Sequence, residues 1–309
     1  MEAYYERPEE TMKIYFNKRP VSGPWGGGNK TLTSLVSALD DEVVFDLDDD
    51  VDVIFCMDPR PNEDGLWYQD FLNHKVKYGS KIVQRIGDVG THGKPELTEL
   101  IRHSIQYSDV CIFPSQWAMD YVDASSDSVI IPNAPLSDFY ENRNKNKTVT
   151  KPIRVVTHHW SDNEKKGFDV YSSFSECVDE NYLFTYIGRY SNKHNKNGIN
   201  YITPRDTAEL KSILPAHDVY LTASKEEAGA NHVLEAIACG LPVVYRNGGG
   251  SIDEYCNKYG VGYDSIDNLS SVLNEVVDNY DTYKNEVLGY TRTNSNLIDE
   301  YLEIINNVN

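Results

Sequence analysis

Short apolar runs alternate with amphipathic segments along the first half of the chain. The runs are nearly continuous, as in the strands of a parallel sheet that is covered on both faces. They lie at residues 12–16, 43–45, 51–57, 81–86, 110–113 and 129–131. Between them, apolar residues recur at helical spacing, as at Leu32, Leu35, Val36 and Leu39. This pattern predicts repeated strand–helix units around a parallel sheet.

A polar segment without periodicity, at residues 141–151, precedes a second series of the same kind. Its composition is typical of a linker between domains. The strands expected after it lie at residues 153–157, 183–187, 200–203, 219–222 and 241–245, and the helices between them at 168–178, 206–214 and 229–239. Ligands of open α/β sheets collect beyond the carboxyl ends of the strands, so we expect the functional site in a cleft between two facing sheets.

The last 40 residues carry two amphipathic runs, which a polar stretch at residues 291–295 separates. Thr, Asn and Ser in that stretch are typical first residues of a helix. The sequence therefore divides into a first domain at residues 1–146, a second at 147–290, and a terminal helix at 291–309 that could pack back on the first domain.

Charge narrows the possible partners. The 309 residues include 29 Lys and Arg against 48 Asp and Glu, a net charge of −19, so the protein repels nucleic-acid backbones and anionic membranes. Any phosphate site must be a local pocket of amides and a few cations. Five widely spaced cysteines form no CxxC pair and indicate reduced core residues. The N-terminal segment has no apolar leader and no run could span a membrane, so we expect a cytoplasmic protein.

The segment at residues 223–244 predicts a strand, a small polar loop, a helix and the next strand. The loop offers the amides of Gly229, Ala230 and Asn231 at a helix N-terminus, where a pyrophosphate is favoured. Glu227 and Glu235 are eight residues apart, or about 12 Å along a helix axis. Carboxylates repel phosphate and accept hydrogen bonds, so these two suit the hydroxyls on either side of a diphosphate. A ligand with hydroxyl-bearing groups on both sides of a diphosphate is a nucleotide sugar.

Here the chain resembles glycosyltransferase family 4, whose members are retaining enzymes of the GT-B fold. The resemblance rests on the Glu-x7-Glu motif of Glu227 and Glu235 with the trailing EAIACGLPVV. It implies an α/β fold of two Rossmann-like domains facing a central cleft, a nucleoside-diphosphate sugar as donor, and no cofactor or metal. It also implies that Glu227 lies near the donor sugar and that Glu235 binds the ribose hydroxyls. The alternative is a helix-capping Glu227 and a solvated Glu235.

A second matching segment follows the first strand of the second domain, at residues 157–168. In the family this loop carries an Arg and then a Lys before Gly, and both neutralise the diphosphate. Lys166 before Gly167 matches the Lys of this pattern, although it could also be a surface lysine. Trp160 occupies the position of the Arg. Three other cations could substitute for that Arg: Lys165, Arg189 and Arg246. We read His158 and His159 as packing or loop residues.

A glycine-rich loop at residues 23–31 follows the first strand. Its spacing does not fit a phosphate loop, because Asn29 stands at the final glycine position and Pro24, which lacks an amide hydrogen, at the first. The resemblance implies a loop facing the cleft, with Gly27 and Gly28 near the donor phosphate; a tight turn is the alternative.

Three further segments have weaker assignments. The resemblance places His92 on the acceptor side and Thr203, Pro204 and Arg205 beside the base of the nucleotide. Gly248–Gly250 form another possible amide nest, or a flexible turn. The acidic run at residues 46–52 lacks the spaced ligands of a metal site and is typical of a solvated loop.

The sequence thus predicts a glycosyltransferase that moves a sugar to a hydroxyl acceptor, and the resemblance implies retention of configuration and catalysis without a metal. Two alternatives remain. A phosphorylase or epimerase would use the same cleft with phosphate or no acceptor, and a catalytically silent sugar-nucleotide-binding subunit would accommodate Trp160.

Overall fold

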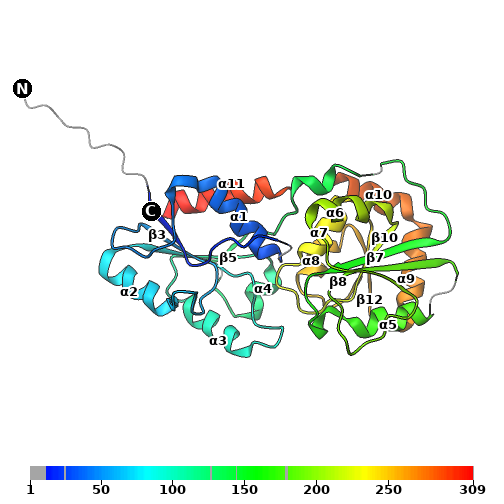
Figure 1. The fold of residues 1–309 in the computed structure, drawn as a ribbon, viewed down its shortest axis with the longest axis horizontal. Helices are drawn as coiled ribbons and strands as arrows, with labels where there is room; N and C mark the ends of the chain where they lie inside the picture. Colours follow the sequence, from blue (N-terminus) through cyan, green and yellow to red (C-terminus); the bar gives the residue numbers. More distant parts are fainter. Residues whose placement is uncertain (1–11, 24–25, 126, 144, 178–179, 309) are drawn as a thin grey trace, which may run out of the picture.

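The structure is a computed structural model that describes residues 12–23, 26–125, 127–143, 145–177 and 180–308. The polar N-terminal segment and Pro24–Trp25 of the glycine-rich loop lie outside the described residues. Two α/β domains lie side by side along the longest axis of the molecule (Figure 1). The predicted fold class is therefore confirmed.

The first domain contains a parallel sheet that has six strands in the described part of the chain, in the order β2-β1-β3-β4-β5-β6. Its strands are β1 (Ile14–Phe16), β2 (Val43–Val44), β3 (Val53–Cys56), β4 (Lys81–Arg85), β5 (Val110–Phe113) and β6 (Val129–Ile130). Each falls within or at a predicted apolar run. Central β3 is fully buried, because helices cover both faces of the sheet.

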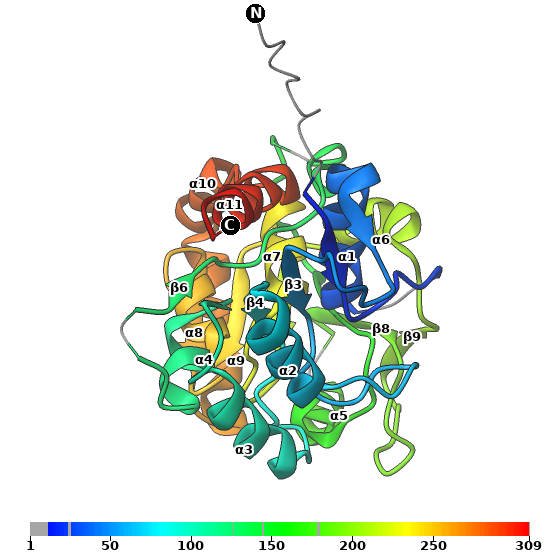
Figure 2. The same ribbon diagram turned by 90° about the vertical axis from the view of Figure 1, so that its left-hand side faces the viewer.

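Two groups of helices cover that sheet. Leu32 and Leu35 of α1 (Gly27–Leu39) pack with strand residues on one face. The opposite face is covered by α2 (Tyr68–Tyr78), α3 (Pro95–Ser104) and α4 (Gln116–Tyr121). Figure 2, which faces the first domain, shows α1 and the last helix on one side of the sheet and α2 and α3 on the other.

The second domain repeats the architecture. Its described strands pair in parallel in the order β12-β11-β10-β7-β8-β9. They are β7 (Ile153–His159), β8 (Tyr182–Gly188), β9 (Ile199–Ile202), β10 (Val219–Thr222), β11 (Val243–Arg246) and β12 (Gly260–Tyr263). The edge strand β12 was missed, because two glycines interrupt its apolar pattern. A side chain at Gly260 would collide with the carbonyl of Val243 on the paired strand, which explains the glycine.

The helices of the second domain also lie on both faces of their sheet. One face carries α6 (Thr207–Ile213), α7 (Asn231–Ala238), α8 (Ser251–Cys256) and α10 (Tyr280–Gly289); the other carries α5 (Phe168–Cys177) and α9 (Ile266–Asp278). The expected single run before residue 291 is therefore two helices, which meet at Asn279.

The last helix, α11 (Asn294–Val308), returns to the first domain and packs along α1. Leu297, Ile298, Tyr301 and Ile305 are buried in the core between α1 and the first sheet. Both ribbon views show α11 beside α1 (Figures 1 and 2). The chain thus crosses between the domains twice, which ties the two domains together.

The polar segment at residues 141–151 is more than a loose linker. Arg143 donates hydrogen bonds to the carbonyl oxygens of Ala238 at 2.6 Å, Val287 at 2.8 Å and Leu288 at 3.0 Å. These carbonyls lie at the ends of α7 and α10, where a cation is favoured by the helix dipole. Arg143 therefore fixes the far end of α7, the helix that carries the predicted motif.

Two further observations concern the chain as a whole. Cys56, Cys111, Cys239 and Cys256 are free thiols in the core, as expected, while the side chain of Cys177 lies outside the described part. None of the described helices has the length and apolar character needed to cross a membrane.

Candidate nucleotide-sugar site

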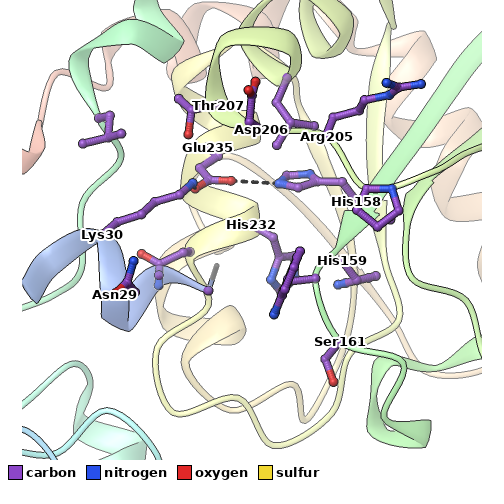
Figure 3. A pocket seen from close by; sticks show the side chains of 18 of the residues that line it. Asn29, Lys30, His158, His159, Ser161, Arg205, Asp206, Thr207, His232 and Glu235 are labelled. Carbon is purple, nitrogen blue, oxygen red and sulfur yellow. Dashed lines mark hydrogen bonds and ion pairs between the residues drawn. The ribbon is translucent and has the colours of Figure 1, made fainter. Parts of the chain in front are cut away.

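A cavity of about 860 Å³ lies between the domains, at the carboxyl ends of both sheets. Its walls come from the loop after β1 with the start of α1, the loop after β7, the residues before and in α6, and the loop into α7. Figure 3 shows side chains of both domains pointing into it. This is the edge at which ligands of open α/β sheets collect.

Glu227 lines this cavity and is paired with Lys166. Its Oε1 is 2.5 Å from Lys166 Nζ, and both side chains are 12% exposed. Burial alone would raise the pKa of Glu227, but Lys166 and two nearby histidines lower it to about 2. Glu227 is therefore an anion at neutral pH.

The backbone of Glu227 is fixed by the glycine-rich turn at residues 248–250. The amide of Glu227 donates to the carbonyl of Gly249 at 3.0 Å, and the amide of Ser251 donates to the carbonyl of Glu227 at 2.8 Å. The suggested phosphate nest at Gly248–Gly250 thus has a different role here: this turn holds the loop that presents Glu227, and it does not line the cavity.

Glu235 faces the same cavity from the second turn of α7 and contacts two cation-forming side chains. Lys30 Nζ lies 2.6 Å from Oε1, and His158 Nε2 lies 2.8 Å from Oε2. Burial alone would raise the pKa of Glu235, but Lys30 and His158 lower it to about 2. Glu235 is a buried residue with 5% of its surface exposed, so the solvated alternative is wrong.

The start of α7 differs in detail from the prediction. The helix begins at Asn231, and its preceding residue is Ala230. The amide of Ala230 donates to Ser251 Oγ at 3.0 Å, so it was wrong to count it as free for a phosphate. Gly229, Ala230 and Asn231 all line the cavity. The predicted anion site at this helix end therefore rests on the amides on either side of Ala230.

The first domain approaches α7 closely through its glycine-rich loop. Gly27 opens α1 and lines the cavity, and any side chain there would collide with the amide group of Asn231. Gly28, the other glycine singled out, is not part of the cavity wall. Glycine at position 27 is thus explained by contact between the domains.

Three histidines gather on the second-domain wall between the two glutamates: His158, His159 and His232. The rings of His159 and His232 are 4.8 Å apart, and those of His158 and His232 are 6.4 Å apart. Burial lowers the pKa of His232 to about 3 and that of His159 well below its usual value. His159 and His232 are therefore neutral hydrogen-bonding groups at physiological pH.

His158 and His159 were read as packing residues, and this is half correct. His159 Nε2 lies 2.8 Å from the Tyr171 hydroxyl and helps to pack the domain. His158 instead lies between Glu235 and the Tyr220 hydroxyl, which is 3.1 Å from its Nδ1. Among the described residues, no three His, Cys, Asp or Glu side chains form a cluster that could hold a metal ion.

Trp160 lines the cavity, and Arg189 lies against it. The guanidinium carbon of Arg189 is 4.1 Å from the centroid of the Trp160 ring, a cation–π contact. Lys165, another proposed substitute for the missing Arg, is paired with Glu226 at 2.8 Å. Arg189 is thus a candidate cation whose side chain contacts a residue of the cavity wall.

The remaining predicted residues lie around the rim. Pro204 and Arg205 line the cavity, Arg205 paired with Glu209 at 3.0 Å, whereas Thr203 does not line it. His92 is also outside the lining; its Nε2 is 3.4 Å from the carbonyl of Lys225, and burial lowers its pKa. His92 therefore touches the edge of the second domain near Glu227.

Lys30, His158 and His232 also line the cavity, although no sequence pattern assigned them to it. Lys30 belongs to the glycine-rich loop at residues 23–31, whose spacing does not fit a phosphate loop. His232 lies inside the Glu-x7-Glu motif, where its spacing from both acids could have drawn attention. The contact of Lys30 with Glu235 joins residues 205 positions apart, and no local pattern predicts it.

Comparison with known proteins agrees with this geometry. Residues 141–287 match the family described as glycosyl transferases group 1. No curated protein matches the chain. Because the matched residues cover most of the second domain, they include Lys166, Glu227, Glu235 and the whole of α7.

Similar solved structures extend over both domains. Anabaena HepE in complex with UDP and glucose has a TM-score of 0.71 at 12% identity, over 96% of this chain and 100% of that one. WaaG, a glycosyltransferase of lipopolysaccharide biosynthesis, gives 0.66 at 15% identity over 95% and 99% of the two chains. Sucrose-phosphate synthase from Thermosynechococcus elongatus gives 0.67 at 12% identity over 96% and 99%. At these identities the likeness establishes a shared fold.

Proposed function

We propose that this chain is a glycosyltransferase, because residues 141–287 match the glycosyl transferases group 1 family and the two domains share the fold of solved glycosyltransferases. It transfers a sugar from a nucleoside-diphosphate sugar to a hydroxyl acceptor, with retention of configuration and without a metal. The observation that carries the proposal is the placement of Glu227, Glu235 and Lys166 around one interdomain cavity.

The cavity suits an extended donor. About 860 Å³ is within the range of ligand pockets that bury a small molecule. We place the ribose at Glu235, the diphosphate over the start of α7, and the sugar beside Glu227. Pro204 and Arg205 then border the base. In this arrangement each carboxylate meets hydroxyls, while the diphosphate meets amides and Lys166.

The bond that breaks in this reaction joins the anomeric carbon to the diphosphate. As it breaks, positive charge develops on the sugar and negative charge on the leaving phosphate. Lys166 and the amides of Gly229 and Asn231 would stabilise the leaving group, in a site where water is largely excluded. The departing phosphate oxygen takes the proton of the acceptor hydroxyl on the same face, so no covalent protein intermediate is required.

The acceptor approaches from the first domain, whose side of the cavity includes the loop before α1. His92 lies beyond this wall, near Glu227. Closure of the domains would bring it to the anomeric carbon. HepE has been solved with UDP and glucose, which favours UDP-glucose as the first donor to test. We also propose a cytoplasmic location, where nucleotide sugars are made.

One observation favours a second function. Trp160 lies where the family resemblance expects an Arg that neutralises the diphosphate, so the chain could be a sugar-nucleotide-binding subunit without turnover. The Arg189 guanidinium lies against the Trp160 ring, where it would supply the positive charge that an active glycosyltransferase needs at the diphosphate.

The test begins with isothermal titration of the purified protein with UDP, GDP, ADP and their glucose conjugates. The best donor is then incubated with a panel of sugar acceptors, with and without EDTA, and nucleoside diphosphate release is followed. Acceptor-dependent release with an α-linked product from an α-linked donor supports the proposal. Tight binding without release supports the silent subunit, exchange of sugar with inorganic phosphate supports a phosphorylase, and absence of nucleotide binding overturns the proposal.

A further inference from the structure

Lys30 is a first-domain residue whose side chain reaches Glu235 on the second-domain wall of the cavity. It lies in the first turn of α1, lines the cavity, and places its ammonium 2.6 Å from Glu235 Oε1. Figure 3 shows Lys30 and His158 approaching Glu235 from opposite sides. The ammonium also lies 5.4 Å from the centre of the Phe139 ring, which limits its freedom.

Stability alone is a weak explanation for this contact. Lys30 is 26% exposed and Glu235 7% exposed at the side chain, so forming the pair removes both charges from most of their water. The loss of hydration largely offsets the attraction in such pairs, and apolar residues of similar volume often do as well. A role in ligand recognition explains better why a lysine stands opposite this carboxylate.

The hydrogen-bonding capacity of the pair leaves room for a ligand. Each carboxylate oxygen of Glu235 has two lone pairs, of which Lys30 uses one on Oε1 and His158 one on Oε2. One acceptor site per oxygen therefore remains for the two neighbouring hydroxyls of a ribose. Because both oxygens are engaged from the sides, the carboxyl plane cannot turn freely in the cavity.

We propose that Lys30 is a positioning residue for ribose recognition: by holding Glu235 against His158 it fixes the carboxylate that accepts both ribose hydroxyls. The inference rests on the proposed function and names a residue of the first domain as part of the donor site. Recognition of the nucleotide then requires the first domain as well as the second. Removing Lys30 should weaken the contribution of the ribose hydroxyls more than that of the rest of the nucleotide.

The test compares UDP with 2′-deoxy-UDP, which lacks one of the two hydroxyls. Dissociation constants are measured by titration calorimetry at fixed ionic strength for wild type, Lys30→Met, Lys30→Arg and the control Lys258→Met. Methionine keeps the length and apolar stem of Lys30. Lys258 is an exposed second-domain lysine paired with Glu286 at 3.2 Å, so its replacement makes the same change in net charge away from the cavity.

We expect wild type and Lys258→Met to prefer UDP over 2′-deoxy-UDP by about tenfold, the effect of one hydrogen bond to a charged group. In Lys30→Met this ratio should fall to about two, while Lys30→Arg should recover most of it. Thermal unfolding midpoints show whether each variant is folded.

Equal weakening of both nucleotides in Lys30→Met, or an unchanged ratio, would show that Lys30 only joins the domains and would overturn the inference. In either case wild type still binds UDP and the proposed function stands. If wild type binds neither UDP, GDP nor ADP, the proposed function fails and this inference fails with it. Should GDP or ADP bind best, its own 2′-deoxy analogue replaces that of UDP.

Discussion

The cavity contains two lysine–glutamate pairs, one formed within the second domain and one formed between the two domains. Lys166 and Glu227 both belong to the second domain and are 61 residues apart, whereas Lys30 and Glu235 belong to different domains and are 205 apart. Each glutamate has a pKa lowered to about 2 by its partners. The pairs therefore differ in how they depend on domain arrangement.

This difference assigns different tasks to the two acids. The Lys166–Glu227 pair persists wherever the first domain lies, because β7, β10 and the turn at Gly248–Gly250 hold both partners in one domain. The Lys30–Glu235 pair exists only while the two domains keep their present separation. The reactive end of the cavity is thus preorganised, and the nucleotide end is completed by contact between domains.

The largest effect is expected at the preorganised pair. Replacing Glu227 by Gln leaves Lys166 without its anionic partner beside the sugar, and turnover should fall by about 10²- to 10³-fold, the range seen when a group that stabilises a transition state is lost. Nucleotide affinity should change little. Steady-state release of nucleoside diphosphate and calorimetric affinity measure the two quantities separately.

Glu226→Gln is the matched control for this variant. Glu226 is the adjacent residue and also forms an ion pair, with Lys165 at 2.8 Å, but at 38% exposure and outside the cavity lining. It should keep nearly full turnover. Comparable losses in both variants would show that the loop, and not the carboxylate of Glu227, matters for the reaction.

The second effect concerns affinity. Glu235→Ala removes the acceptor of two ribose hydroxyls, so nucleotide binding should weaken by about 1–3 kcal/mol while the rate at saturating donor changes less. Calorimetry with UDP measures this change. The exposed Glu286→Ala serves as control, and an affinity equal to that of wild type would remove Glu235 from the nucleotide site.

Local sequence patterns predicted most of the fold and some of the residues of the site. Buried parallel strands are continuous apolar runs, so the strands through β11 could be located from hydropathy, whereas β12 could not because Gly260 and Gly262 are required by close packing. Glu227 and Glu235 were found because both belong to one strand–loop–helix unit with a recognisable spacing.

What the sequence did not show depends on distant contacts. Lys30 meets Glu235 only when the two domains have assembled. Arg143 contacts Ala238 at the end of α7 although the two residues are 95 positions apart. The hydrogen bond from the Ala230 amide to Ser251 likewise joins the starts of two helices, α7 and α8. Such pairs have no fixed separation along the chain, and a single sequence therefore does not reveal them.

The third effect is a pH dependence that arises at His232, between the two pairs. The pKa of His232 is about 3 in the folded protein, against 6.5 for an ordinary histidine. Between these two pH values the unfolded chain is protonated at His232 and the folded chain is not. Stability should fall as pH drops from 6.5 towards 3. Between pH 7.5 and pH 5, wild type should lose about 1–2 kcal/mol more than His232→Gln in urea titrations. The exposed His103→Gln should behave as wild type, and parallel losses in all three proteins would contradict a buried neutral His232.

The smallest effect compares the two acids directly. Both have a folded pKa of about 2 against 4.5 for an ordinary Glu, so the stability they contribute is present above pH 4.5 and is lost as pH falls towards 2. The stability difference between wild type and either Glu→Gln variant should shrink, by on the order of 1 kcal/mol, between pH 5 and pH 3. Only Glu235→Gln should also enlarge the radius of gyration at pH 7 in X-ray scattering, because only that acid joins the domains. An equal change in Glu227→Gln would contradict the distinction between a pair inside one domain and a pair across two.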